Sequence, residues 1–147
     1  MMNTLANTLS WFKIALAKPT NKNVHTQLGV HFEEVAEMLT ALGSHDPETA
    51  NLLESSLQAL QKLSTHLKQQ DDVLLIVSRI DLLDAIADQL VTLTGSAHVL
   101  NMNIVGALNE VNDSNFSKFE EGVPVFDENQ KIKKGRYYHK PNLEPYV

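Results

Sequence analysis

Cysteine is absent from this chain, and glycine, proline and aromatic residues are few. The 147 residues include no cysteine, six glycines and five prolines, and 6% are aromatic. Without cysteine there is no disulfide framework, no thiolate-ligated zinc or iron–sulfur site and no thiol nucleophile. A run of about 18 apolar residues, long enough to span a membrane, does not occur either, and no basic cluster precedes an apolar stretch near the N-terminus. We therefore expect a cytoplasmic protein without redox chemistry.

Positive charge is also scarce. Twelve lysine and arginine residues stand against 18 aspartate and glutamate residues, a net charge of −6. Proteins bind nucleic acid and anionic membranes through clustered positive charge, so we expect neither as a partner. A cation is a more suitable partner for a chain of this net charge. The length and the 43% hydrophobic content favour one folded domain over residues 1–147. We expect an N-terminal helix over 1–20, a helical core over 24–119 and a basic tail over 120–147.

Apolar residues recur at spacings of three and four along most of the chain, which is the pattern of amphipathic helices. Gly43 ends one such stripe, and Asp46-Pro47 begins the next as an N-cap followed by a first-turn proline. The run Val73–Val77 is continuously apolar, so its periodicity does not decide between helix and strand before Ile80. The expected fold class is all-α, a bundle of four to five helices. The stripes cover residues 3–16, 28–42, 53–67, 73–90 and 104–111.

The tail has a different character. Gly122 and Pro124 interrupt the helical pattern, and the residues around them predict a short β-hairpin with strands at Val123–Phe126 and Lys131–Lys133 and a turn at 127–130. Five of the twelve basic residues lie in this part of the chain, so an acidic bundle ends in a basic tail. They are Lys131, Lys133, Lys134, Arg136 and Lys140.

Carboxylates flank the apolar stripes of two predicted helices. On each helix they lie three or four residues apart and share a face, where like charges repel by a few tenths of a kcal/mol per pair. Mg²⁺ would relieve this repulsion, because it prefers oxygen ligands and is commonly held by a few carboxylates and substrate phosphates; Mn²⁺ could replace it. The alternative interpretation is that both clusters are ordinary solvated faces. The residues are Glu33, Glu34 and Glu37 on one helix and Asp81, Asp84 and Asp88 on the other.

Other chemical motifs are missing. The sequence has no Glu-x-x-His for a di-iron bundle, no His-Glu-x-x-His, no P-loop, no dinucleotide-binding glycine motif and no Gly-x-Ser-x-Gly. His31 and His98 are expected to be packed or surface residues, and Trp11 and Phe12 are expected in the core.

Two runs resemble a known family. HFEEVAEM at residues 31–38, followed by LDAIADQL at 83–90, is similar to the MazG-like superfamily of all-α nucleoside triphosphate pyrophosphohydrolases. That superfamily also holds phosphoribosyl-ATP pyrophosphohydrolases and dimeric dUTPases. Its metal motif pairs Glu-x-x-Glu on one helix with Glu-x-x-Asp on another. The resemblance covers about residues 24–141.

The resemblance assigns the carboxylates individually. Glu34 and Glu37 match the first pair, and Asp88 matches the last acid, whereas Ala85 stands where the second motif has glutamate. Asp84 shares a face with Asp88 and is the expected replacement. Asp81, one turn earlier, is a further candidate ligand.

A second stretch supports the match. EVNDSNFSKF at residues 110–119 resembles the Ser-Asn-x-Ser-Lys segment of phage and bacterial members, in which the asparagine and the basic residue face the nucleotide. The resemblance therefore implies substrate-binding roles for Asn115 and Lys118. The ending at 131–141 is similar to the basic tail of those members, which adds Lys134 and Arg136.

The family implies a homodimer or homotetramer that cleaves a nucleoside triphosphate to the monophosphate and pyrophosphate with Mg²⁺. Lys118 would bind phosphate oxygens, Asn115 a sugar hydroxyl or base edge, and Glu33 or Glu37 would act as general base for the attacking water. Two alternatives stay open. The chain could be a non-enzymatic helical interaction or regulatory protein, or its substrate could be phosphoribosyl-ATP.

Overall fold

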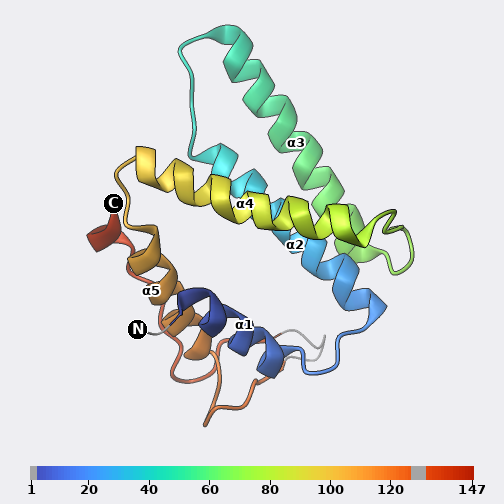
Figure 1. The fold of residues 1–147 in the computed structure, drawn as a ribbon, viewed down its shortest axis with the longest axis vertical. Helices are drawn as coiled ribbons and strands as arrows, with labels where there is room; N and C mark the ends of the chain where they lie inside the picture. Colours follow the sequence, from blue (N-terminus) through green and yellow to red (C-terminus); the bar gives the residue numbers. More distant parts are fainter. Residues whose placement is uncertain (1–2, 127–131) are drawn as a thin grey trace. The chain divides into compact units, whose positions relative to one another are not determined.

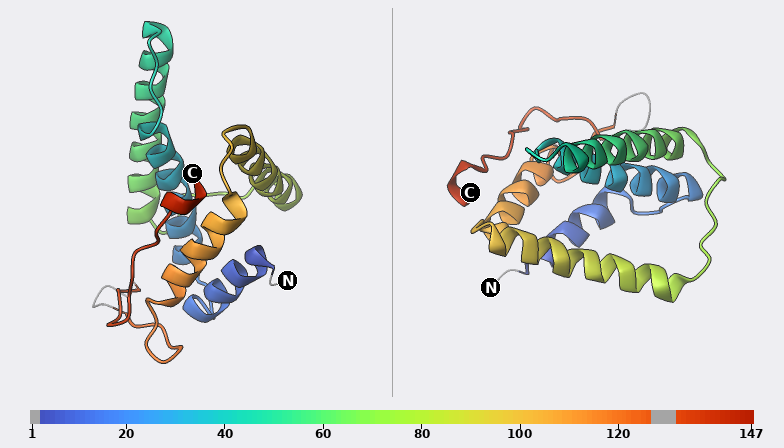
Figure 2. Two further views of the ribbon diagram at one scale, coloured as in Figure 1. Left: turned by 90° about the vertical axis from the view of Figure 1, so that its left-hand side faces the viewer. Right: turned by 90° about the horizontal axis from the view of Figure 1, so that it is seen from above.

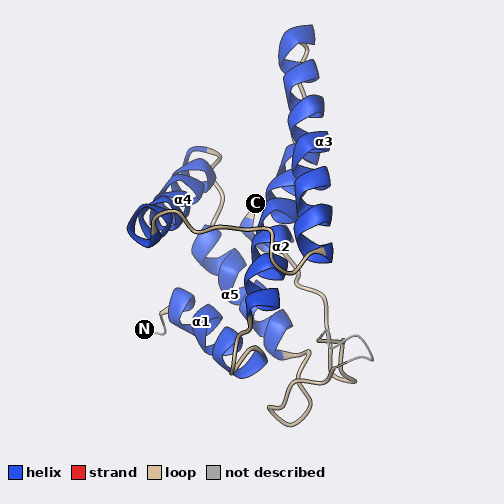
Figure 3. Cartoon of the chain, turned by 90° about the vertical axis from the view of Figure 1, so that its right-hand side faces the viewer, coloured by secondary structure: helices blue, strands red, loops and turns tan. Residues whose placement is uncertain are grey.

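Five α-helices make up most of the chain, as the spacing of the apolar residues predicts. The computed structural model describes residues 3–126 and 132–147, and within them no β-sheet forms, so the all-α class is confirmed (Figures 1 and 3). The elements are α1 (Thr4–Ala15), α2 (Asn21–Thr40), α3 (Pro47–Gln69), α4 (Arg79–Val99), α5 (Ile104–Phe116) and the short 3-10 helix η1 (Glu144–Tyr146).

The chain divides into two compact units, which we describe separately. The hairpin unit, Lys18–Ile76, contains α2 and α3. The terminal unit combines Met1–Ala17 with Val77–Val147 and contains the remaining helices. Figure 2 shows α2 beside α3 and α1 beside α5 in both of its views, in agreement with the packing of these pairs. A single domain over the whole length stays a prediction.

Local hydrogen bonds fix where the helices of the hairpin unit begin. Thr20 and Asn23 form a capping box at the start of α2, in which each side chain accepts from the backbone N–H of the other. Asp46 caps α3 through a bond of 2.8 Å from the Thr49 N–H to Oδ2, and Pro47 occupies the first turn. The predicted N-cap and proline are therefore confirmed.

Small residues let α2 approach α3 closely. Gly29 and Ala36 are buried on α2, and a Cβ atom added to Gly29 would lie 3.0 Å from the backbone oxygen of Ser64. Leu39 of the predicted stripe also faces α3, whereas Leu42, its last member, lies beyond the end of α2 and is 54% exposed. Close backbone approach selects for side-chain size, which a hydrophobic pattern does not record.

The segment between α3 and α4 is not helical, and residues 71–78 form no regular secondary structure. His25, 1% exposed on α2, accepts hydrogen bonds of 3.1 Å from the backbone N–H groups of Val73 and Leu74. These bonds hold the apolar run away from helical geometry, which resolves the ambiguity in its periodicity. Ser78 then caps α4 by accepting from the Asp81 N–H at 3.2 Å.

In the terminal unit, a buried asparagine joins α1 to α5. Asn112, 3% exposed, accepts a bond of 2.9 Å from the Thr8 hydroxyl and donates one of 3.0 Å to the backbone oxygen of Thr4. Trp11 adds a third link, because its Nε1–H donates to the backbone oxygen of Asn115 at 2.9 Å. Polar bonds thus fix the register of this helix pair.

Helix α4 is the least packed element of its unit. Its packing partner within the unit is α5, and none of its residues is buried. Ile80 and Leu83, two members of its predicted apolar stripe, are 82% and 68% exposed. Neither α4 nor any other helix in the described ranges has the combination of length and apolar character needed to span a membrane.

The tail pairs briefly with itself and then follows α5. Phe126 and Ile132 form one antiparallel bridge, and the Lys133 N–H donates to the Val125 oxygen at 2.9 Å. The predicted strands are therefore reduced to a single bridge, and the turn at 127–130 and Lys131 lie outside the described residues. Further on, the Ser114 hydroxyl donates to the backbone oxygen of His139 at 2.8 Å.

Candidate active site

The three glutamates of α2 differ in exposure and in partners. Glu34 and Glu37 are exposed, whereas Glu33 is half-buried and pairs with Lys68 of α3, with 2.7 Å between Oε1 and Nζ. Both members of this pair are partly exposed, so it contributes modestly to stability. The pairing balances the charge of Glu33, which leaves Glu37 as the better placed of the two candidate bases.

A hollow of about 370 Å³ lies between the two helices beside these acids. Two of the three α2 glutamates line it, and so does Ser64 of α3, which is 2% exposed. The α3 wall of the hollow is therefore polar, like the α2 wall. Its lining residues are Glu33, Ala36, Glu37, Gln61, Ser64 and Thr65.

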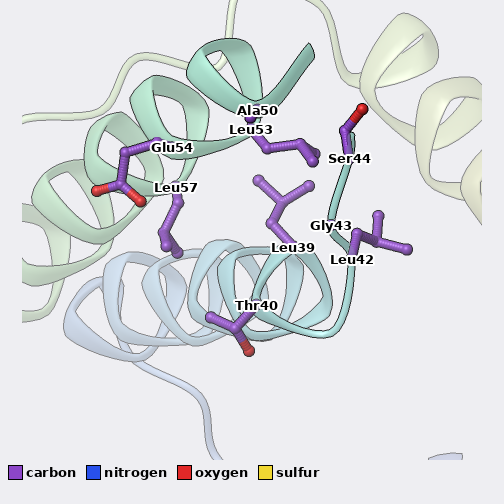
Figure 4. Close-up of a pocket in the computed structure, with 9 residues that line it drawn as sticks. All are labelled: Leu39, Thr40, Leu42, Gly43, Ser44, Ala50, Leu53, Glu54 and Leu57. Atoms are coloured by element: carbon purple, nitrogen blue, oxygen red, sulfur yellow. The ribbon is translucent and has the colours of Figure 1, made fainter. Parts of the chain in front are cut away.

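A second hollow, of about 450 Å³, lies at the loop end of the hairpin and is different in character. Leu39 of α2 and Leu53 of α3 point toward one another there, and the carboxylate of Glu54 points away from them (Figure 4). Thr40, Ser44 and Glu54 also line this hollow. The hollow beside Glu33 and Glu37 is the one that contains two of the predicted site residues.

The aspartates of α4 occupy one edge of an exposed helix. Asp81, Asp84 and Asp88 are all exposed, and Asp81 lies in the first turn, where a negative charge is favourable at a helix N-terminus. Asp81 therefore has a structural role that needs no metal. The other two carboxylates have no such local explanation.

The carboxylates supply the right donor atoms for Mg²⁺ but do not form a site within either unit. In the part of the chain that the structure describes, no three histidine, aspartate or glutamate side chains come together as a metal ion would require. Glu34 and Glu37 belong to the hairpin unit, and Asp84 and Asp88 to the terminal unit. Their joint coordination of a metal stays a prediction.

The two residues expected to face a nucleotide are in direct contact. Lys118 Nζ donates to Asn115 Oδ1 at 2.7 Å and lies 5.8 Å from the centroid of the Trp11 ring. Trp11 in turn stacks on buried Phe119, with 5.8 Å between ring centroids and 6° between planes. An amide, an ammonium group and an aromatic ring thus meet at the C-terminal end of α5.

The tail brings more positive charge to the same end of α5. The Gly135 N–H donates to the Lys118 oxygen at 3.2 Å, and a Cβ at Gly135 would lie 2.7 Å from that oxygen, so only glycine allows this approach. The backbone of Lys134 and Arg136, on either side of Gly135, therefore lies near Lys118, and the Arg136 guanidinium also pairs with Glu121, with 3.6 Å between Nη2 and Oε1. Each also makes a cation–π contact: Lys134 Nζ lies 4.8 Å from the centroid of the Tyr138 ring, and Arg136 Cζ lies 4.9 Å from that of Tyr137.

The sequence did not predict four buried polar residues, His25, Ser64, Asn112 and Ser114, each at most 4% exposed. A signal for them was present, because each occupies a position where the spacing of three and four continues an apolar stripe. His25, Asn112 and Ser114 hydrogen-bond to partners in the structure, as buried polar groups usually do.

We compared the chain with models of known protein families, with curated proteins and with solved structures, and none of them matches. The motif resemblance therefore stays a prediction.

Proposed function

We propose that this chain is a Mg²⁺-dependent nucleoside triphosphate pyrophosphohydrolase, which cleaves a ribo- or deoxyribonucleoside triphosphate to the monophosphate and pyrophosphate. The observation that carries the proposal is the cluster at the end of α5. There, Asn115 and Lys118 are in contact beside Trp11, and a backbone bond from Gly135 brings the tail with Lys134 and Arg136 to Lys118. An ammonium group beside an amide and an aromatic ring suits an anionic nucleotide.

The cluster binds the substrate. Lys118, Lys134 and Arg136 contact phosphate oxygens and stabilise the negative charge that grows on them as the phosphoanhydride bond breaks. Asn115 has an amide that both donates and accepts, so it can bind a sugar hydroxyl or a base edge.

The carboxylates of α2 and α4 provide the metal ligands and the general base. In this proposal Glu34, Glu37, Asp84 and Asp88 hold Mg²⁺, with Mn²⁺ as a substitute and Asp81 as a further ligand. The ion would neutralise phosphate charge and lower the pKa of a bound water. Glu37, or else Glu33, accepts a proton as the water oxygen bonds to phosphorus and pyrophosphate leaves.

Self-association belongs to the same proposal. Large aliphatic side chains along α4 are between about two-fifths and four-fifths exposed, including Leu90 at 47% and Val91 at 69%. Soluble monomers rarely expose an apolar patch larger than roughly 300–600 Å². We therefore propose a homodimer or homotetramer in which α4 is covered.

Pyrophosphate release from a panel of ribo- and deoxyribonucleoside triphosphates and phosphoribosyl-ATP, with and without Mg²⁺, tests the proposed activity. We expect metal-dependent release from at least one substrate, and a decrease of about 10²–10⁴-fold in Glu37→Gln. Asp88→Asn should also lose activity, whereas Glu54→Gln, which changes an exposed acid of α3, should not. Unchanged turnover in Glu37→Gln would refute its assigned role.

The exposed apolar face of α4 also favours a second candidate, a non-enzymatic helical protein that docks on a partner. Thermal melting separates the two candidates. Specific Mg²⁺ binding to the folded chain raises the melting temperature by mass action, and Asp88→Asn should abolish that rise. A solvated acidic face would respond to Mg²⁺ only as it does to any salt.

A further inference from the structure

Trp11 links α1 to the two residues that are proposed to meet the substrate. Its indole Nε1–H donates to the Asn115 backbone oxygen at 2.9 Å, and Lys118 Nζ lies 5.8 Å from the centroid of its ring. Trp11 is half-buried and stacks on Phe119, which is 5% exposed. All four residues belong to the terminal unit, so one unit holds every one of these contacts.

The Asn115 backbone oxygen is the point at which the contacts meet. It accepts from the Lys118 backbone N–H at 3.2 Å as well as from the indole. Asn115 lies in the last turn of α5, where backbone carbonyls lack the usual partner within the helix. The indole N–H therefore fixes the turn of backbone that carries the side chains of both Asn115 and Lys118.

The side chain of Lys118 is held at a second point. Its Nζ donates to Asn115 Oδ1 at 2.7 Å and lies over the Trp11 ring, so a long and otherwise flexible side chain has a defined direction. An aliphatic side chain at position 11 would offer neither the N–H nor the ring.

Lys118 makes no ion pair with a carboxylate in the part of the chain that the structure describes. The acids that follow it closely, Glu120 and Glu121, both bond to Arg136. Asn115 and Trp11, which contact its ammonium group, are neutral. A half-buried ammonium group beside neutral partners keeps its attraction for an anion.

We propose that Trp11 is a positioning residue, which orients Lys118 toward the phosphate groups of the substrate. This role rests on the proposed function, in which Lys118 stabilises the charge that grows on phosphate oxygens. A lysine whose direction is set before the substrate arrives loses less freedom on binding and is already in place in the transition state. Trp11 thus acts through Lys118 and not on the reacting atoms.

A spectroscopic signal reports this coupling without turnover. The sequence contains one tryptophan, so the indole N–H of Trp11 gives a single ¹⁵N signal, which we would follow during titration with inorganic pyrophosphate. We expect a saturable shift, because an anion that binds Lys118 changes the position of its ammonium group over the ring. Lys118→Gln should abolish the shift, whereas Lys13→Gln, which removes an exposed lysine of α1, should keep it. A shift that persists in Lys118→Gln, or none in wild type, would overturn the proposal.

Two substitutions separate the indole N–H from the packing around it. Trp11→Phe keeps an aromatic ring and removes the donor. Phe12→Leu changes the ring that meets Trp11 edge-on, with 5.0 Å between centroids, and leaves the donor in place.

Turnover of the two variants should therefore differ. We expect Trp11→Phe to lower kcat about tenfold with KM within about twofold of wild type, since the direction of Lys118 matters most in the transition state. Phe12→Leu should leave both constants within about twofold of wild type. An unchanged kcat in Trp11→Phe, or an equal loss in Phe12→Leu, would contradict the positioning role.

A double-mutant cycle tests whether Trp11 acts through Lys118. In a Lys118→Gln background, Trp11→Phe should change kcat by no more than about twofold, because the residue that Trp11 orients is gone. The same tenfold loss in both backgrounds would show that Trp11 acts on the fold and not on Lys118.

The two proposals can fail separately. If the wild type hydrolyses nucleotides but Trp11→Phe retains its kcat and pyrophosphate leaves the indole signal unmoved, the positioning role is wrong and the activity stands. If pyrophosphate moves the indole signal through Lys118 but no nucleotide is hydrolysed, the activity is wrong and Trp11 still positions an anion-binding lysine.

Discussion

His25 uses both of its ring nitrogens inside the hairpin unit. Nδ1 lies 2.9 Å from the Asn21 carbonyl oxygen, and Nε2 faces the N–H groups of Val73 and Leu74. Because a carbonyl only accepts and an N–H only donates, the partners assign the proton of a neutral ring to Nδ1. One side chain thus fixes the course of the chain after α3.

Removal of this ring should therefore be costly. We expect His25→Ala to lower the free energy of unfolding by about 2 kcal/mol, because two part-buried amides lose their acceptor. Denaturant unfolding monitored by circular dichroism measures the change. His45→Ala, in the exposed loop before α3, is the control, and equal midpoints for the two variants would show that the bonds of His25 do not matter.

Asp46 gives a pH-dependent prediction at the same scale. Hydrogen bonds from the Thr49 hydroxyl, and then from the Thr49 backbone N–H, lower the pKa of Asp46 below its ordinary value of 3.8. The folded state therefore favours the charged cap, so its contribution is complete above the ordinary value and is lost as the pH falls through the lowered one.

We expect wild type to lose more stability than Asp46→Asn between about pH 5 and pH 2, since asparagine caps α3 without titrating. Unfolding midpoints across this range, with an NMR titration of the Asp46 carboxyl, provide the measurement. The idea fails if Asp46 titrates at or above its ordinary value.

The α2–α3 hairpin depends on close packing at glycine. A methyl group at Gly29 would meet Lys68 Cγ at 2.8 Å and the Ser64 backbone oxygen at 3.0 Å, and the backbone oxygen cannot move aside without a shift of α3. Gly29→Ala should therefore destabilise the protein by about 1–3 kcal/mol. Gly43→Ala is the matched control, because no atom lies within 4 Å of its added Cβ. Thermal melting of both variants tests this, and a loss in Gly43→Ala equal to that in Gly29→Ala would contradict the steric explanation.

The positions of the elements were largely predictable from the sequence. Asp46, Pro47 and Gly43 mark the start of α3 and the end of α2 through chemistry confined to a few neighbouring residues. The contact between Asn115 and Lys118 is of the same local kind, because residues three apart at the end of a helix lie close together.

What the sequence did not predict depends on contacts between distant residues. The burial of Gly29 and Ala36 against α3 was not predicted, because these residues pack through their small size rather than their hydrophobicity. The approach of the tail to Lys118 depends on bonds between residues far apart in the chain, such as those from the Gly135 N–H to the Lys118 oxygen and from the Arg136 N–H to the Glu120 carboxylate, which no periodicity encodes.

The whole molecule is expected to self-associate through α4. Leu90→Glu should shift the protein toward a monomer in sedimentation velocity, because a charge on the apolar face opposes its burial. Thr92→Glu, at an exposed polar position of the same helix, should leave the association state unchanged. A wild-type chain that is monomeric at every concentration would contradict the proposed oligomer.

The sequence by itself determined the all-α class, the helix boundaries set by caps and breakers, and the pairs of acids that share a helix face, because each depends on interactions within one or two turns. The tertiary structure decided the non-helical path at Val73 and Leu74, the burial of the Ser64 hydroxyl, and the approach of the tail to the end of α5. These features come from residues far apart in the chain, whose meeting depends on packing, size and single hydrogen bonds rather than on periodicity.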